Sequence, residues 1–592
     1  MTTRPILNIN MTQQPRYQTS RSITKMSPNI WDIIVLLIVF GILAALAWGA
    51  SRMALPYSVG ESIQITLDPW ALPGYAISSV LRMFIAMFFS LLVTFTIAPL
   101  AAKNRHAEKF LLPLIDVLQS IPVLGMLSIT VVGFISLFPN SLLGPECAAV
   151  FAIFTSQVWN MILSLYQSLR TVPHDLQEVC KMYHLSGWQK FWKVEIPHGM
   201  QALIWNTMVS MSAGWFFVVL SEAIEVSKQQ ITLPGLGSYI YVAMREANLV
   251  AQCYAIIAML IVILLYDQLI FRPLLSWAEK FKAEIDDDAE VYESWFLNML
   301  TKTRLVRTIE FLFSIVGDWF INGYKKFIPR KSIELSTQTQ TAITETTILV
   351  WNVFLIAGIA LAAIALVVLI QKEIALSEVL HVFYLGFLTA LKVFTLIIIA
   401  SIIWIPVGVW VGLRPKVTSY VQPLIQILAA FPANLFYPIV VYMIIEYNLN
   451  HNIWTMPLMI LGTQWYILFN VISGTARIPK DVRLAAKNFG VKGTLWWRKI
   501  VLPGIFPNYI TGAMAAAGGC WNASIVAEYV EWGDQTIIST GIGQYITLYT
   551  QEGDFPRIAL GIGVMCIYVL FFTRILWQRL YQFASERFTM DT

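Results

Sequence analysis

Long apolar segments with almost no charge are the feature of this sequence that most constrains its fold. Runs of roughly 17 or more apolar residues recur along the chain, and a helix of about 20 such residues spans the hydrocarbon core of a bilayer. Hydrophobic residues make up 57% of the 592 residues, whereas charged residues make up only 13%. We therefore predict an all-α polytopic membrane protein and exclude disordered, collagenous and disulfide-stapled secreted proteins.

The apolar runs predict about 12 transmembrane helices in two sets of six. The first set covers residues 30–50, 77–101, 112–137, 147–169, 202–220 and 250–271. The second set covers residues 348–370, 384–413, 421–445, 453–472, 509–526 and 558–576. Residues 1–28 are polar and lead into a segment too long for a signal-peptide core, so we expect a cytoplasmic tail and no cleavable signal.

The distribution of Lys and Arg predicts the orientation. With the N-terminus inside, 33 of the 40 basic residues lie on the cytoplasmic side, two lie within spans and five lie outside. This excess of positive charge inside predicts that both termini are cytoplasmic. Residues 226–249 and 532–557 are then expected to face outward.

Residues 276–345 separate the two sets of spans and are expected to be a cytoplasmic linker. The segment opens acidic and closes with Ser, Thr and Gln. Apolar residues recur between these ends at helical spacing, at Leu305, Ile309, Leu312, Phe313, Val316 and Phe320. This pattern indicates an amphipathic helix on the inner membrane surface. The linker joins a first repeat, residues 29–275, to a second, residues 346–592.

The two sets of spans are copies of one another. Pro113 and Pro423 match at an offset of 310, and after a slip of four residues the offset becomes 306. The pairs at this second offset include Trp159 and Trp465, Trp215 and Trp521, Glu222 and Glu528, Glu225 and Glu531, and Gly235 to Tyr239 with Gly541 to Tyr545. Equal span counts and a shared orientation predict parallel repeats related by an axis along the membrane normal.

The most informative cytoplasmic loop follows the fourth span of each repeat. Residues 178–197 read EVCKMYHLSGWQKFWKVEIP, and residues 484–503 read LAAKNFGVKGTLWWRKIVLP. They resemble the Glu-Ala-Ala (EAA) loop of the inner-membrane permeases of binding-protein-dependent ABC importers. The Trp and Phe pattern, the Trp before the paired glutamates and the Gly-Leu-Gly further on resemble the subgroup for nitrate, sulfonates, taurine and bicarbonate.

The resemblance implies two coupling loops, residues 174–197 and 480–503, that dock on separate ATPase subunits. The residues it implicates are Glu178, His184, Ser186, Gly187 and Trp188, with Ala485, Ala486, Gly490, Val491 and Lys492. The first loop has His184 where the family has Gly, and the second has Leu484 where the family has Glu. His tolerates a positive φ better than most residues, so we expect both loops to be competent but unequal.

Charged residues within or beside spans are candidates for the substrate pathway. Glu222 and Glu528 follow matched spans; they form either a ring at the outer gate or interfacial caps for the next loop. Arg82 and Lys392 match at offset 310, and snorkelling toward the headgroups is favoured over attraction of an anion. Trp215 and Trp521 are retained as pathway candidates, although such residues more often serve in packing.

The remaining motifs predict absences. No GxxxxGK[ST] occurs, so we expect no ATPase site and no cofactor in this chain, ATP being bound by the partner subunits. The five cysteines lie far apart, so no metal site is expected, and the net charge of +5 indicates orientation rather than nucleic-acid binding.

We therefore interpret the chain as a transport subunit, not an enzyme. The resemblance implies that its partners, besides membrane lipid, are two ABC ATPase subunits and a solute-binding protein, and that its cargo is a small oxyanion or sulfonate in a bacterial inner membrane. The alternative is a secondary transporter with two parallel six-helix repeats, which would need coupling carboxylates at mid-span.

Overall fold

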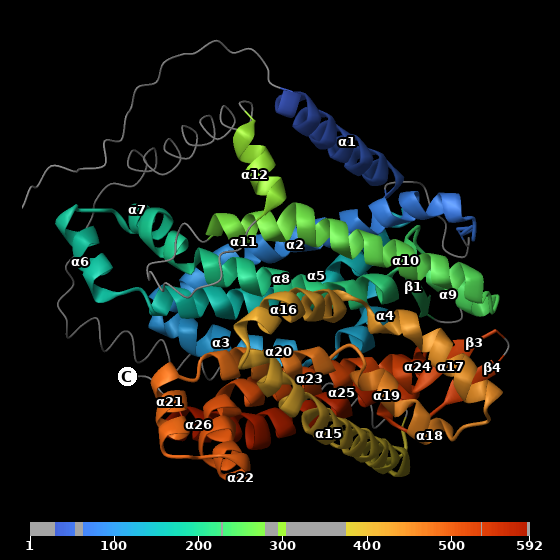
Figure 1. Ribbon diagram of the computed structural model, residues 1–592. Helices are drawn as coiled ribbons and strands as arrows, with labels where there is room; N and C mark the ends of the chain where they lie inside the picture. The colour runs from blue at the N-terminus through green and yellow to red at the C-terminus, as the bar shows by residue number, and fades with distance from the viewer. Residues whose placement is uncertain are drawn as a thin grey trace, which may run out of the picture.

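The computed structural model describes residues 30–53, 63–226, 229–278, 294–303, 374–533 and 535–588 (Figure 1). The seventh predicted span, residues 348–370, and most of the linker with its amphipathic pattern lie outside these residues.

The described chain is helical, with two short hairpins. The first half contains α1 Ile30–Met53, α2 Leu72–Lys103, α3 Arg105–Ser120, α4 Val123–Leu137, α5 Leu143–Arg170, α6 His174–Met182, α7 Gly187–Lys190, α8 Ile196–Ser221, β1 Ala223–Val226, β2 Gln229–Thr232, α9 Leu236–Arg245, α10 Leu249–Tyr266, α11 Arg272–Ala278 and α12 Trp295–Lys302. The second half contains α15 Leu376–Gly412, α16 Pro415–Ala430, α17 Tyr437–Glu446, α18 His451–Trp454, α19 Met456–Ile460, α20 Gln464–Ala476, α21 Lys480–Asn488, α22 Gly493–Trp496, α23 Leu502–Ala527, β3 Tyr529–Trp532, β4 Gln535–Ile538, α24 Ile542–Glu552, α25 Phe555–Phe572 and α26 Gln578–Phe588.

Seven helices among the described residues are long and apolar enough to cross a membrane, or up to nine if each bent pair counts as one span. The all-helical polytopic class is therefore confirmed, but three predicted spans are not continuous helices. Residues 421–445 bend by 76° and residues 453–472 by 45°. Residues 112–137 divide into α3 and α4 at Pro122. Proline disfavours a helical conformation in the residue before it and lacks an N–H, so the helix stops there.

The duplication extends to local irregularities of the backbone. Phe191–Glu195 and Trp497–Val501 are π-helical turns at matched positions, as are Asp267–Phe271 and Thr573–Trp577. Each pair keeps the offset of 306 found in the sequence. Helices α6 and α7 lie at the same end of the molecule as α21 and α22 (Figure 1). The halves therefore run in parallel.

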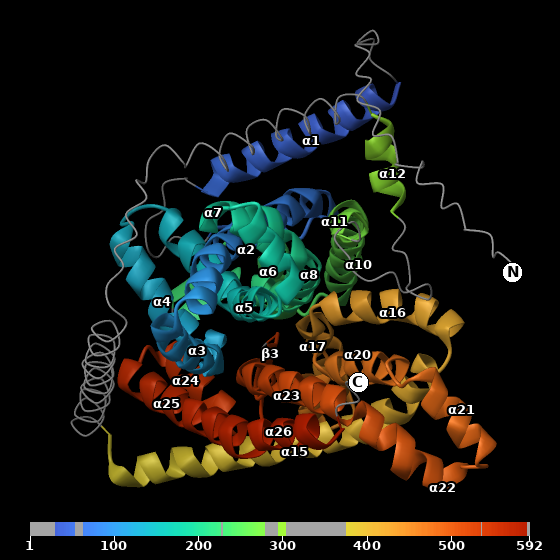
Figure 2. The same ribbon diagram turned by 90° about the vertical axis from the view of Figure 1, so that its left-hand side faces the viewer.

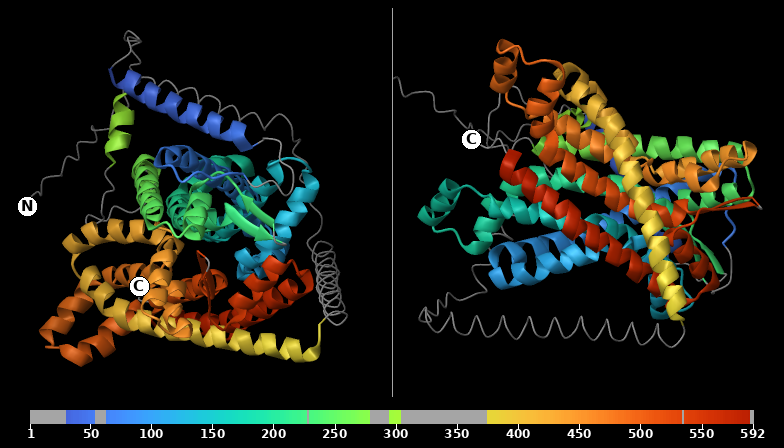
Figure 3. Two further views of the ribbon diagram at one scale, coloured as in Figure 1. Left: turned by 90° about the vertical axis from the view of Figure 1, so that its right-hand side faces the viewer. Right: turned by 90° about the horizontal axis from the view of Figure 1, so that it is seen from below.

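The hairpins were not predicted from the sequence. In each, two antiparallel strands of four residues pair directly, β1 with β2 and β3 with β4. Four residues are too few to establish an alternating pattern. We call the end of the molecule that carries these hairpins, α9 and α24 the hairpin end, and the end with α6, α7, α21 and α22 the loop end (Figures 1 and 3).

At the interface, a helix of each half packs against helices of the other half. Helix α4 of the first half packs against α23, α24 and α25, while α16 of the second half packs against α8 and α10 (Figure 2). The backbone N–H of Val123, at the start of α4, donates to Asn522 Oδ1 of the other half at 3.0 Å. The largest cluster of buried apolar side chains also draws on both halves, so the repeats share one core.

Candidate functional site

Glu222 organises the hairpin end of the first half. Its carboxylate accepts hydrogen bonds from the Ser79 hydroxyl at 2.6 Å, the Arg82 guanidinium at 2.7 Å and the Gly237 N–H at 2.6 Å. Gly237 lies in the first turn of α9, and the N–H of Leu236 beside it donates to Ser79 Oγ. Because the first N–H groups of a helix lack partners within it, a carboxylate placed there satisfies a donor and complements the helix dipole.

Arg82 joins this carboxylate to a second one. Its Nε and Nη2 donate to the two oxygens of Glu146 at 2.6 and 2.7 Å, a bidentate pairing. The Arg82 residue is only 1% exposed and Glu222 is 0% exposed. The guanidinium therefore lies in the interior rather than snorkelling toward headgroups, because its two partners hold it there. We call Ser79, Arg82, Glu146, Glu222 and Gly237 the first clamp.

The second half repeats the arrangement, with Lys392 in the place of Arg82 and Thr389 in the place of Ser79. Glu528 accepts hydrogen bonds from Thr389 at 3.0 Å, Lys392 Nζ at 2.9 Å and the Gly543 N–H at 2.8 Å. The Lys392 side chain is 11% exposed. We call Thr389, Lys392, Glu528 and Gly543 the second clamp. It contains one carboxylate per cation, whereas the first clamp contains two, so the pseudo-symmetric sites differ in formal charge.

The Gly-x-Gly motifs are explained by close backbone approach. A Cβ on Gly237 would lie 2.1 Å from the carbonyl oxygen of Val219, and one on Gly543 would lie 2.3 Å from that of Ser524. Non-bonded carbon and oxygen atoms do not approach each other this closely. Glycine is therefore required for α9 and α24 to reach the carboxylates of the clamps.

A further network anchors α24 in the second half. Glu378, at the start of α15, accepts hydrogen bonds from the Tyr545 hydroxyl at 2.9 Å and from Arg557 Nε at 2.7 Å. Burial, together with the hydrogen bond to Glu378, raises the pKa of Tyr545. The phenol thus remains protonated and acts as a donor at neutral pH. In the first half, the matched Tyr239 donates instead to the carbonyl of Leu67 at 3.0 Å.

The two tryptophans retained as pathway candidates lie in the core. Trp215 is 1% exposed and packs edge-on against Tyr266, while Trp521 is 3% exposed and stacks on Tyr568.

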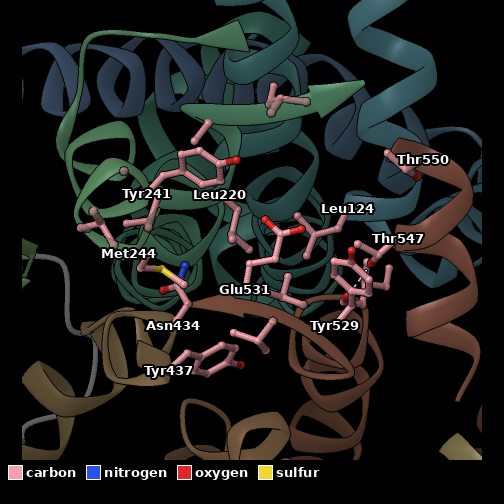
Figure 4. A pocket seen from close by; sticks show the side chains of 18 of the residues that line it. Leu124, Leu220, Tyr241, Met244, Asn434, Tyr437, Tyr529, Glu531, Thr547 and Thr550 are labelled. Carbon is pink, nitrogen blue, oxygen red and sulfur yellow. Dashed lines mark hydrogen bonds between the residues drawn. The ribbon is translucent and has the colours of Figure 1, made fainter. Parts of the chain in front are cut away.

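A cavity of about 240 Å³ lies between the halves at the hairpin end (Figure 4). Helix α9 borders it in the first half and α24 in the second. The matched positions of these helices carry different side chains: Tyr241, Met244 and Arg245 in α9 correspond to Thr547, Thr550 and Gln551 in α24. Leu124 of α4 similarly corresponds to Asn434. The cavity is therefore built by equivalent elements but is chemically asymmetric.

The clamps do not line this cavity, apart from Gly237, but they hold the helices that do. The sequence analysis identified Glu222 and Glu528 but missed Glu146 of the first clamp and most of the cavity lining, including Asn434, Tyr529 and Thr547. The one available signal was Glu531, which was recognised as part of the matched pairs and which lines the cavity. The other lining positions carry ordinary residues whose proximity depends on the packing of the halves.

Residues 174–197, the first loop singled out from the sequence, contain two short helices joined by a turn. Helix α6 carries Glu178, whose carboxylate lies 3.4 Å from His174 and is largely exposed. His184 adopts a φ of +49° in the turn. Ser186 then caps α7, which contains Gly187 and Trp188, through a reciprocal capping box with Gln189.

The second loop, residues 480–503, has Gly490 at the matched turn, with a φ of +66°. Ala485 and Ala486 lie in α21, Val491 follows the turn, and Lys492 is the residue before α22. Both loops expose large apolar side chains at their tips. Met182 and Tyr183 are 77% and 76% exposed in the first loop, and Phe489 is 85% exposed in the second.

Comparison with known proteins is consistent with this arrangement. The model of the family described as "Binding-protein-dependent transport system inner membrane component" matches residues 90–271 and 404–587, together more than half of the chain. The chain is 22% identical over 205 residues to the bicarbonate transport system permease protein CmpB of Synechococcus elongatus, which covers 35% of this chain and 67% of the relative.

Two other relatives cover less of their own length. The nitrate import permease protein NrtB of Synechocystis is 24% identical over 193 residues, covering 33% of this chain and 65% of the relative. The taurine transport system permease protein TauC of Escherichia coli is 25% identical over 133 residues, covering 22% of this chain and 46% of the relative.

Proposed function

This chain belongs to the family of inner-membrane components of binding-protein-dependent transport systems, as a duplicated member with both permease units in one polypeptide, and from this premise we propose how it works. It forms the pathway of an ABC importer between its two halves. Its coupling loops transmit the movements of separate ATPase subunits to the cavity at the hairpin end.

The observation that carries this proposal is the pair of exposed loops at one end of the molecule. Each places a residue with positive φ between two short helices, His184 in one and Gly490 in the other. Each also presents bulky apolar side chains to solvent at its tip. Exposed apolar groups of this kind mark a surface for a protein partner. In this proposal one ATPase subunit docks on each loop.

The transport cycle follows from this geometry. ATP closes the ATPase pair, which draws α6 and α21 together and moves the helices that continue into α8 and α23. These helices end at the clamps, so their movement separates α9 from α24 and opens the cavity outward. A solute-binding protein then delivers cargo, and hydrolysis returns the chain to an inward-open state.

In this proposal the clamps hold other parts of the pathway in position. Arg82 and Glu222 in the first half, and Lys392 and Glu528 in the second, fix the helices that line the cavity. The pathway role expected for these four residues is thus indirect. Trp215 and Trp521 support the same helices by packing.

The proposed membrane is a bacterial inner membrane, with both termini and both coupling loops in the cytoplasm. The proposed cargo is a small solute with an anionic group, either an oxyanion or a sulfonate. Support comes from the names of the relatives, which are permeases for bicarbonate, nitrate and taurine.

Co-purification of the full chain with candidate ATPase and solute-binding proteins, sought among the products of the neighbouring genes, tests the proposal. We expect a complex with ATPase, and cargo-stimulated ATP hydrolysis in liposomes that requires the binding protein. Uptake driven by a proton or sodium gradient without ATPase would instead indicate the secondary transporter.

A further inference from the structure

A second cavity lies between the halves beside the one already described. Its volume is about 110 Å³, against about 240 Å³ for the cavity at the hairpin end. We call the larger one the outer cavity and the smaller one the inner cavity. Helix α8 of the first half borders the inner cavity together with α16, α19, α20 and α23 of the second half.

The two cavities follow one another along the same pair of helices. On the first half, the inner cavity is bordered within residues 212–217 and the outer one within residues 219–224. On the second half, the corresponding stretches are residues 519–523 and 525–531. Since α8 and α23 both end at the hairpins, the inner cavity lies nearer the loop end. The cavities are therefore two compartments in series between the halves.

Tyr437 separates these compartments. It is the one described residue that borders both cavities, and Figure 4 shows its ring at the edge of the outer one. The residue is only 1% exposed, so its side chain is packed between the cavities and leaves no open passage past its own ring. Its hydroxyl donates to the backbone carbonyl oxygen of Leu458 at 2.8 Å. The ring is thus a partition held in place by a hydrogen bond.

Both ends of this hydrogen bond lie beside breaks in bent spans. Tyr437 is the first residue of α17, which follows the bend of 76° after α16. Leu458 lies in α19, just before the bend of 45° that leads into α20. Helix ends beside such breaks absorb changes in φ and ψ when segments move. A movement of α17 relative to α19 would separate the hydroxyl from its acceptor and withdraw the ring.

The first half has no equivalent of this tyrosine. Its matched residue, at the offset of 310, is Leu127, which borders the outer cavity but not the inner one. A leucine side chain has no hydroxyl to donate. The partition and the hydrogen bond that holds it therefore come from the second half.

We propose that Tyr437 is a gate between the two compartments of the pathway, held closed by its hydrogen bond to the Leu458 carbonyl. Cargo passes from the outer to the inner cavity when the ring moves aside. The inference rests on the proposed function, because it assigns a gate to the pathway named there.

The strength of this hydrogen bond suits a gate. The net contribution of one hydrogen bond shifts an equilibrium between two states by about two- to tenfold. That is enough to favour the closed position of the ring, but it is small beside the movement of whole helices. The same motion that rearranges the bent spans can therefore open the gate.

Cysteine reporters in the two cavities test the proposal. In the full-length chain without its five native cysteines, Ala223→Cys reports on the outer cavity and Ala213→Cys on the inner one. A membrane-impermeant methanethiosulfonate with a quaternary ammonium group is added to intact cells and, separately, to inside-out vesicles. The comparison uses the side from which Ala223→Cys reacts. We expect Ala213→Cys to react at least about tenfold more slowly from that side, because an open minor state is populated to about 10% or less.

Three variants assign the difference to the tyrosine. Tyr437→Ala removes the ring and should reduce the difference between the reporters to less than about threefold. Tyr437→Phe keeps the ring and removes the hydrogen bond, so the labelling of Ala213→Cys should accelerate about two- to tenfold. The control is Tyr442→Ala, a tyrosine of the same helix that is exposed and borders neither cavity; it should leave both rates unchanged.

Equal reactivity of the two reporters without a gate substitution would overturn the proposal. An unchanged rate at Ala213→Cys in Tyr437→Phe, or an equal acceleration in Tyr442→Ala, would also overturn it. Because the phenylalanine variant preserves the volume of the ring, the test does not depend on the folding of the larger truncation.

The gate and the proposed function fail in different ways. Labelling of Ala223→Cys from the cytoplasmic side would contradict the proposed orientation, while the comparison with Ala213→Cys from that side would still decide the gate. A chain that fails this comparison but co-purifies with ATPase would retain the proposed function and lose only the gate.

Discussion

Arg82 and Glu222, 140 positions apart in the sequence, are joined by a buried ion pair of 2.7 Å. The pair ties α2 to the end of α8, and through the Gly237 N–H it also holds the start of α9. The Arg82 guanidinium thus connects α2 and α8 to α9, which borders the cavity between the halves.

Removing this guanidinium should destabilise the protein strongly. Arg82→Met leaves Glu146 and Glu222 buried without their cation, and breaking a buried ion pair from one side costs about 3–5 kcal/mol. We expect a large loss of folded protein in detergent, measured by size-exclusion chromatography after heating. The control is Arg105→Met, an exposed arginine of α3. Equal thermal stability of the two variants would contradict the role assigned to the first clamp.

The matched substitution in the second half should be milder. Lys392→Met leaves one buried carboxylate without its cation, whereas Arg82→Met leaves two. Glu528 also keeps its hydrogen bonds from Thr389 and the Gly543 N–H. The partial exposure of Lys392 also lowers its contribution. We expect Lys392→Met to retain more folded protein than Arg82→Met in the same heating assay. The reverse order would show that the formal charge of the clamps does not determine their strength.

The glycines of the clamps should not tolerate a methyl group. In Gly237→Ala and Gly543→Ala the new Cβ would overlap backbone carbonyls at 2.1 and 2.3 Å. Backbone must then shift, at a cost of about 1–3 kcal/mol or more. Gly518→Ala is the control, because no atom lies within 4 Å of its added Cβ. Thermal unfolding of the three variants measures the difference, and a neutral Gly237→Ala would refute the close-approach explanation.

The two coupling loops should respond unequally to substitution. Glu178→Ala removes a carboxylate whose charge-assisted contact with an ATPase would be worth about 1.5–3 kcal/mol, whereas Leu484→Ala removes only packing. We expect the first change to reduce ATPase capture and cargo-stimulated hydrolysis, and the second to have a mild effect. If Leu484→Ala proves as damaging as Glu178→Ala, the loops engage their partners equivalently.

The turn positions of these loops give a separate prediction. Gly490→Val forces a β-branched residue into a φ of +66°, at a cost of about 1–3 kcal/mol. His184→Gly relaxes the matched turn at +49° and should leave coupling intact. ATPase pull-down with each variant measures the effect. Loss of binding in His184→Gly would mean that the imidazole itself contacts the ATPase.

Cysteine labelling of intact cells checks the orientation. In a background without the five native cysteines, Lys492→Cys at the loop end should react only after permeabilisation, whereas Gln535→Cys in β4 should react from outside. Both positions are exposed, so accessibility reports the side of the membrane. External labelling of Lys492→Cys would reverse the proposed topology.

The sequence by itself determined the class of this protein and its duplication. Apolar runs, repeated motifs and the turn positions His184 and Gly490 are local properties, and they persist in any fold that the chain adopts in a membrane.

Only the tertiary structure decided what the charged residues do. The sequence alone did not decide whether Glu222 belongs to an outer gate or caps the next loop. It also favoured an Arg82 side chain that reaches the headgroups. The burial of Arg82 depends on Glu146 and Glu222, which lie 64 and 140 positions away in the sequence. The cavity likewise lies between α9 and α24, so its asymmetric lining exists only once the halves pack together. Spacing within a helix predicts which face is apolar, but partners from distant segments are fixed by packing, which no local pattern records.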